Sequence, residues 1–109
     1  MSFERACALT DVPEDEALGV TLGSLAVAVA RNGDEVFALQ DLCSHAAVAL
    51  SEGEVEDCTV ECWLHGSRFD LRTGKPTGPP ATEPVAVYAV QVDGDDVLVD
   101  VTAPLNSVD

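Results

Sequence analysis

Two short segments decide how this sequence is interpreted: Cys43-Ser44-His45 and Cys62-Trp63-Leu64-His65. The chain has two histidines and four cysteines, and both histidines and two of the cysteines lie in these segments. Thiolate and imidazole are strong ligands for iron and zinc. The two Cys/His pairs therefore predict a four-ligand metal site.

The spacing within each pair favours two metal ions over one. In an extended loop the side chains at positions 43 and 45 leave the same face, about 6–7 Å apart along the chain. Side chains that start so far apart reach two neighbouring metals more easily than a single one. The second pair is spaced like a tight turn, so two facing turns would offer two thiolates to one metal and two imidazoles to the other. This is the ligand set of a Rieske [2Fe–2S] centre.

The sequence resembles the Rieske iron–sulfur family, whose signature is Cys-x-His, a spacer and Cys-x-x-His-Gly. Here sixteen residues separate the two halves, and the resemblance continues through Gly66-Ser67-Arg68-Phe69-Asp70, Thr73-Gly74 and Gly78-Pro79-Pro80-Ala81. It covers in effect the whole chain. It implies one Rieske domain over residues 1–109, a cluster-binding lobe at about 42–82, and one [2Fe–2S] cluster held by Cys43, His45, Cys62 and His65.

Short β-prone runs separated by turns predict an antiparallel all-β fold. The resemblance implies stacked sheets with the smaller lobe at one end. Residues 24–30 and 35–40 form a hairpin around Asn32-Gly33-Asp34, although the alanines in 24–30 leave helix as a weak competitor. Further strands are expected at 3–9, 17–20, 56–63, 68–71, 85–92 and 97–101, with a loose tail from Pro104.

Cys58 is the rival of Cys62 as a ligand, because a regular strand over 56–63 would put Cys58, Val60 and Cys62 on one face. We favour Cys62, which stands at the Cys-x-x-His spacing. Cys7 is expected to be a buried structural thiol. Ser67 is read either as a hydrogen-bond donor to a cluster sulfide or as a turn residue.

Composition narrows the function classes. The chain has 109 residues and a net charge of −15, with 20 acidic against 5 basic residues. Nucleic acid and anionic membrane surfaces are therefore unfavourable partners, whereas a basic protein surface is favourable. Met1-Ser2-Phe3-Glu4-Arg5 lacks the pattern of a signal peptide, and no apolar run is long enough for a membrane helix. We expect a soluble, cytoplasmic monomer whose cysteines are metal ligands or free thiols.

The resemblance implies an electron carrier rather than an enzyme. High-potential members of the family have an extra cysteine in each ligand loop, joined by a disulfide, and Val48 and Leu64 occupy those positions here. The chain is therefore similar to the low-potential ferredoxins that serve bacterial oxygenases. Both histidines are committed to the cluster, which leaves none for a second, catalytic iron. The implied partners are a ferredoxin reductase and a terminal oxygenase or another acceptor, each docked transiently.

Docking is expected at the tip formed by His45 and His65, with Trp63, Leu64 and the proline loop as its apolar part. Packing of Trp63 against the cluster is the alternative role for that side chain. Two other readings of the whole chain remain: a structural zinc module with Cys2His2 ligands, and a protein similar to the small subunit of nitrite reductase, which shares the fold.

Overall fold

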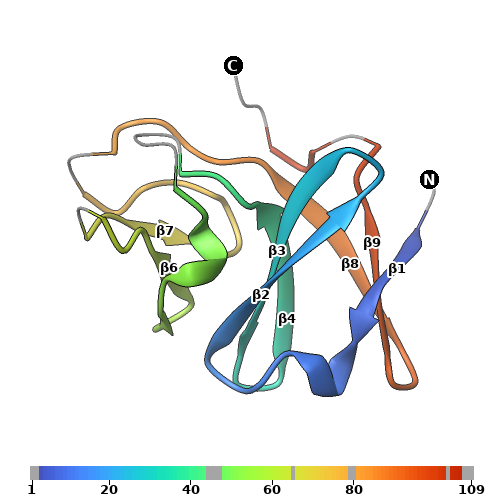
Figure 1. Cartoon of the computed structure of the whole chain (residues 1–109). Coiled ribbons are helices and arrows are strands. Elements are labelled where there is room, and N and C mark those ends of the chain that lie inside the picture. The colour runs from blue at the N-terminus through green and yellow to red at the C-terminus, as the bar shows by residue number, and fades with distance from the viewer. Residues whose placement is uncertain (1–2, 44–47, 65, 79–80, 103, 107–109) are drawn as a thin grey trace.

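The computed structural model describes residues 3–43, 48–64, 66–78, 81–102 and 104–106. Its elements form two antiparallel sheets, shown in Figure 1. In chain order they are β1 (Glu4–Ala8), η1 (Leu9–Asp11), β2 (Glu16–Leu22), β3 (Leu25–Asn32), β4 (Glu35–Gln40), η2 (Leu50–Glu52), β5 (Val55–Glu56), β6 (Thr59–Glu61), β7 (Arg68–Asp70), β8 (Val87–Asp93) and β9 (Asp96–Asp100). The all-β prediction is confirmed.

The larger sheet has six strands in the order β1-β9-β8-β4-β3-β2, and we call it the base sheet. The edge strands β1 and β2 also approach one another, so the sheet curls around its own interior. Three of its hairpins have two-residue loops that begin with a glycine at positive φ, as at Gly33 (φ 62°). Loops of this length with glycine first match the twist of the paired strands. The hairpin predicted at Asn32-Gly33-Asp34 is confirmed.

The smaller sheet joins β5, β6 and β7 and lies beside the base sheet (Figure 1). We call the described residues between β4 and β8, which contain this sheet, the lobe. The buried apolar side chains form two groups. The sheet core lies within the curl of the base sheet and includes Cys7, Val27, Val29 and Tyr88. The lobe core lies between the sheets and includes Ala28, Ala30, Leu39, Val60 and Phe69.

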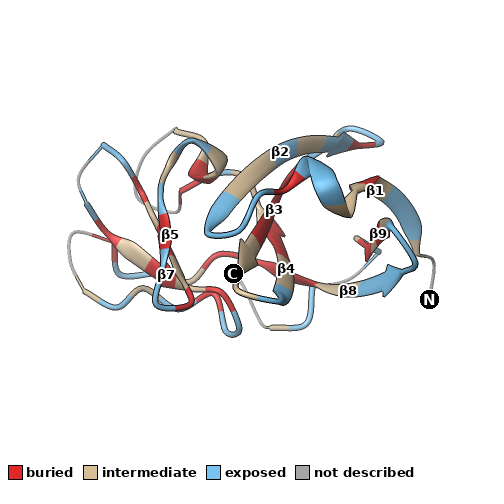
Figure 2. Cartoon of the chain, turned by 90° about the horizontal axis from the view of Figure 1, so that it is seen from below, coloured by how far each residue is buried: buried red, intermediate tan, exposed pale blue. Residues whose placement is uncertain are grey.

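Strand β3 separates these two cores. Val27 and Val29 belong to the sheet core, whereas Ala28 and Ala30 belong to the lobe core. All four are buried, and Figure 2 shows the buried colour along this strand. The alanines that blurred the hydrophobic alternation therefore mark a strand that is covered on both faces.

Two expectations of the sequence analysis are wrong in detail. Residues 56–63 do not form one strand, because β5 and β6 are separated by a turn at Asp57-Cys58, both with positive φ (53° and 58°). The tail expected from Pro104 is anchored, since Leu105 N–H donates to the carbonyl of Val87 at 2.7 Å. The strand expected at 17–20 is longer, Glu16–Leu22.

Candidate metal centre

The first ligand loop leaves β4 and reaches Cys43, which is buried. The Cys43 N–H donates to the carbonyl of Val48 at 3.0 Å. Just before it, the carboxylate of Asp41 accepts hydrogen bonds from the N–H and the hydroxyl of Ser51, both at 2.7 Å. Hydrogen bonds to a carboxylate are stronger than those between neutral groups. The two ends of this loop are therefore tied together close to the thiol.

The second ligand loop connects β6 to β7 and begins at Cys62, whose side chain is fully buried. The Cys62 N–H donates to the carbonyl of Ser67 at 2.6 Å, and the Gly66 N–H donates back to the carbonyl of Cys62 at 2.8 Å. The antiparallel pairing of the two strands brings the ends of the loop together. Cys62 is consequently held at the end of a hairpin.

The two loops are built alike. In each, the cysteine N–H donates to the carbonyl five residues further on, from Cys43 to Val48 and from Cys62 to Ser67. Both thiols belong to the lobe core. The structure therefore brings the two predicted cysteine ligands into one buried environment, although they are far apart in sequence. The predicted ligands His45 and His65 lie outside the described residues.

Ser67 lies at the end of the second loop and is buried. Its hydroxyl oxygen accepts a hydrogen bond from the Ala81 N–H at 3.1 Å. This contact ties the segment that follows the proline pair to the second ligand loop, while Thr77 N–H donates to the carbonyl of Arg68 at 2.8 Å on the preceding side. Ser67 is thus more than a turn residue, and its role toward a cluster sulfide stays a prediction. Pro79 and Pro80 lie outside the described residues.

The rival thiol Cys58 lies at the opposite end of β6 from Cys62. The three residues of β6 separate them, a span of four residue steps or about 13 Å at 3.3 Å per step. Burial is the main factor that raises the pKa of the Cys58 thiol, and the guanidinium of Arg72 opposes the shift. The position of Cys58 in the turn therefore favours Cys62.

Large apolar side chains are exposed next to both candidate cysteines. Leu42 precedes Cys43, and Trp63 and Leu64 follow Cys62; their exposed fractions are 50%, 50% and 44%. Within the described ranges, the other large apolar residues that are exposed are Val92 and Leu105. Large apolar side chains that stay exposed beside a buried site are typical of an interaction surface. We call Leu42, Trp63 and Leu64 the apolar rim.

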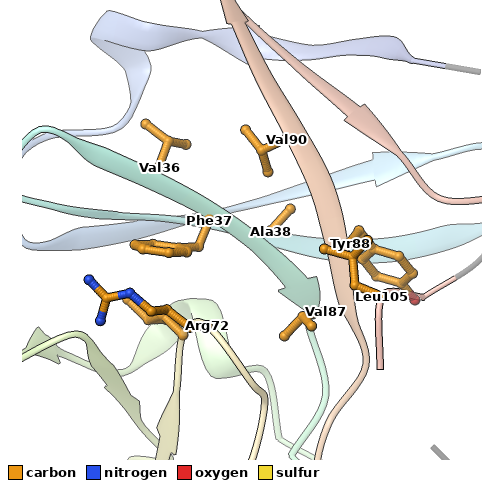
Figure 3. Close-up of a pocket in the computed structure, with 9 residues that line it drawn as sticks. Val36, Phe37, Ala38, Arg72, Val87, Tyr88, Val90 and Leu105 are labelled. Carbon is orange, nitrogen blue, oxygen red and sulfur yellow. The ribbon is translucent and has the colours of Figure 1, made fainter. Parts of the chain in front are cut away.

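A separate depression of about 280 Å³ lies where the lobe meets β4 and β8 (Figure 3). Phe37 and Tyr88 line it from the base sheet, and Arg72 lines it from the lobe. The guanidinium of Arg72 lies 5.7 Å from the centre of the Phe37 ring and 3.0 Å from a carboxylate oxygen of Glu35. Burial raises the pKa of the Tyr88 phenol, which is therefore neutral at pH 7. This depression could not be predicted from local sequence patterns, because its walls come from four segments that are distant along the chain.

The described half of the donor set, Cys43 and Cys62, fits an iron–sulfur cluster. Two buried cysteines stand in equivalent loops, and soft thiolate ligands suit iron–sulfur clusters. Within the described part of the chain no three His, Cys, Asp or Glu side chains gather around a common point, and both histidines lie outside that part. Among the described residues, no helix has the length and apolar character needed to span a membrane.

Comparison with known proteins agrees with this site. Residues 2–89 match the family model of the Rieske [2Fe-2S] domain. The chain is 46% identical over 101 residues to the biphenyl dioxygenase ferredoxin subunit of Pseudomonas sp. strain KKS102, covering 92% of this chain and 93% of that one.

Two solved structures are similar as well. The ferredoxin of carbazole 1,9a-dioxygenase from Nocardioides aromaticivorans IC177 has a TM-score of 0.85 at 38% identity, covering 91% of this chain and 97% of that one. A ferredoxin in a complex of reduced oxygenase and oxidized ferredoxin in carbazole 1,9a-dioxygenase has a TM-score of 0.82 at 35% identity, covering 89% and 91%. The family match favours a cluster over the alternative of a zinc module. The chain belongs to the Rieske [2Fe–2S] family, in which it is a ferredoxin that carries electrons.

Proposed function

We propose that Cys43 and Cys62 bind one iron of the cluster and that His45 and His65 bind the other. One observation carries this proposal: both thiols are buried in one core, in loops that share the same Cys N–H to carbonyl hydrogen bond. A bound Rieske cluster takes up and releases one electron. The chain's own residues hold the thiols away from water and tie both loops at their ends. We take residues 1–109 as one domain with its cluster-binding lobe at about 42–82.

The electron acceptor is proposed to be a terminal oxygenase, and the electron donor a ferredoxin reductase. A related ferredoxin is solved in a complex with its oxygenase. The apolar rim gives a partner a desolvated contact next to the candidate cluster site. We further propose that the carrier is a monomer that works in the cytoplasm, where thiols such as Cys7 and Cys58 stay reduced.

The ligand assignment is tested by comparing Cys62→Ser with Cys58→Ser. Both changes replace a buried thiol with a hydroxyl in the same core, so they are matched in chemistry and burial. Visible and electron paramagnetic resonance spectra of the anaerobically purified proteins are the measurement. Cys62→Ser is expected to lose the reduced-state signal, whereas Cys58→Ser keeps it. A normal signal in Cys62→Ser would refute the assignment.

The docking role is tested with Trp63→Ala. Tryptophan is enriched among the residues that dominate binding, and its loss commonly weakens a contact by about tenfold or more. We expect slower electron transfer from the reductase at low protein concentration, with an unchanged cluster spectrum. Val92→Ala, an exposed apolar residue on β8, is the control. Unaltered rates in Trp63→Ala would leave the side chain with a packing role alone.

A further inference from the structure

The C-terminal segment makes contacts that the expected tail would not make. The side-chain amide of Asn106 is used on both sides: its Oδ1 accepts from the Val87 N–H at 3.0 Å, and its Nδ2 donates to the carbonyls of Val85 at 2.9 Å and Thr73 at 3.0 Å. Val87 begins β8 of the base sheet, and Thr73 follows β7 of the lobe. One side chain therefore joins the lobe to the base sheet.

Where the lobe meets the base sheet, the backbones of Gly74 and Val85 lie close together; we call this place the junction. The Val85 N–H donates to the carbonyl of Gly74 at 2.9 Å. Gly74 has a φ of 75°, and a Cβ atom there would lie 2.1 Å from the carbonyl oxygen of Val85. A residue with a side chain would separate the two segments, because that contact is far below van der Waals distance. The junction thus depends on a glycine in the lobe and an amide from the C-terminal segment.

The depression in Figure 3 lies along the same boundary. Leu71 and Arg72 line it from the lobe, Val87 lines it from the base sheet, and Leu105 lines it from the C-terminal segment. Side chains leave about 280 Å³ unfilled there. The lobe and the base sheet are therefore not close-packed across this depression. Hydrogen bonds across the boundary therefore contribute more to fixing the position of the lobe relative to the base sheet.

The junction is connected to the candidate metal centre. Val85, which Asn106 binds, lies four residues after Ala81, and the Ala81 N–H donates to the Ser67 hydroxyl. The carbonyl of Ser67 in turn accepts the N–H of Cys62. A short series of hydrogen-bonded segments therefore connects the side-chain amide of Asn106 to the candidate ligand Cys62.

We propose that Asn106 is a positioning residue of the lobe: by binding Thr73, Val85 and Val87 at once, it holds the second ligand loop in place against the base sheet. The link to the cluster rests on the proposed ligand role of Cys62. The link to the orientation of the lobe does not, because it follows from the contacts of Asn106.

Hydrogen exchange measured by mass spectrometry on the cluster-loaded protein tests the proposal. In Asn106→Ala, exchange in peptides covering residues 59–70 should become about ten- to hundredfold faster, since three neutral hydrogen bonds are lost and each changes an equilibrium several-fold. Peptides covering residues 25–38 of the base sheet should be unchanged. As a second readout, chelator should bleach the visible absorption of the cluster faster in the variant.

Two further variants sharpen the test. Asn106→Asp keeps the acceptor for the Val87 N–H and places a carboxylate against the carbonyls of Thr73 and Val85, so it should behave like Asn106→Ala. Thr102→Val removes a hydrogen bond to Asp100 in the same C-terminal segment and should behave like wild type.

Three results would overturn the proposal: normal exchange in Asn106→Asp, faster exchange confined to residues 85–87, or an equal rise in both sheets. Faster lobe exchange with unaltered bleaching would refute only the link to the cluster. Failure of the ligand assignment would be detected separately, as a normal reduced-state signal in Cys62→Ser.

Discussion

Cys7 shows how a single buried group makes stability depend on pH. It lies in the sheet core, 5% exposed, and burial is the main factor that raises the pKa of its thiol, with the charge of Asp11 acting in the same direction. At neutral pH the thiol is protonated in both the folded and the unfolded chain. Above the pKa of the unfolded thiol, about 8.5, the unfolded chain loses this proton while the folded chain keeps it. The contribution of Cys7 to stability is therefore present below that pH and lost as pH rises.

We accordingly predict that the free energy of unfolding falls between pH 8 and pH 10. In Cys7→Ala the decline should be shallower, because one of the groups that drive it is gone. The starting stability at pH 7 should be lower by about 1 kcal/mol, since the variant leaves a small cavity. Denaturant titration at several pH values measures both quantities. Parallel pH profiles for the two proteins would contradict the assignment to Cys7.

At the scale of elements, one face of β3 is buried along part of the strand and exposed along the rest. Ala28 and Ala30 are buried against the lobe, whereas Ala26, on the same face of the strand, is exposed. Small side chains at 28 and 30 allow the lobe core to approach the base sheet closely. The strand therefore does not show the regular hydrophobic alternation of a half-buried strand.

This difference in burial predicts unequal losses of stability for two similar substitutions. Ala28→Leu should lower the free energy of unfolding by about 1–3 kcal/mol, because extra methylenes in a packed core force neighbouring atoms apart. Ala26→Leu should change it by less than about 0.5 kcal/mol, as is usual on a surface. Denaturant unfolding of both variants is the measurement. Equal losses would show that strand propensity rather than packing decides the outcome.

Sequence patterns were sufficient for the hairpins, and they singled out two cysteines that the structure buries in one core. They were insufficient for two local features. The Asn-Gly turn and the Cys-x-x-His spacing both depend on neighbouring residues, so they can be read along the chain. The turn at Asp57-Cys58 requires positive φ at two residues that are not glycine, which local preference does not favour. It is held from a distance by Asn32, whose Oδ1 accepts the Cys58 N–H at 3.3 Å. The anchoring of Asn106 likewise depends on distant backbone groups.

At the scale of the whole molecule, the acidic side chains are numerous, and some of them are concentrated around one cleft. A cleft of about 450 Å³ lies between the start of β2 and η2, and Asp15, Glu16, Glu52 and Glu54 line it. The first two lie where the chain enters β2, and the other two belong to the lobe. Like charges that face each other repel, and salt screens this repulsion. The acidic surface therefore opposes the contact between lobe and base sheet at low ionic strength.

We predict that raising the salt concentration from about 0.02 M to 0.5 M increases Tm by about 4 °C or more, which corresponds to roughly 1 kcal/mol in a domain of this size. Glu52→Gln should raise Tm in low salt and reduce the further gain from salt. Glu4→Gln, on β1 and away from the cleft, is the matched control. A full salt response in Glu52→Gln would place the repulsion elsewhere on the surface.

The pairing of β1 with β9 has a consequence for synthesis on the ribosome. Among the strands of the two described sheets, β1 is translated before the others and β9 after them, yet β9 is the hydrogen-bonded neighbour of β1 in the base sheet. β1 must therefore wait, unpaired, until every other strand of both sheets has been translated. The base sheet cannot be completed from the N-terminus onward, so its final closure follows the arrival of β9.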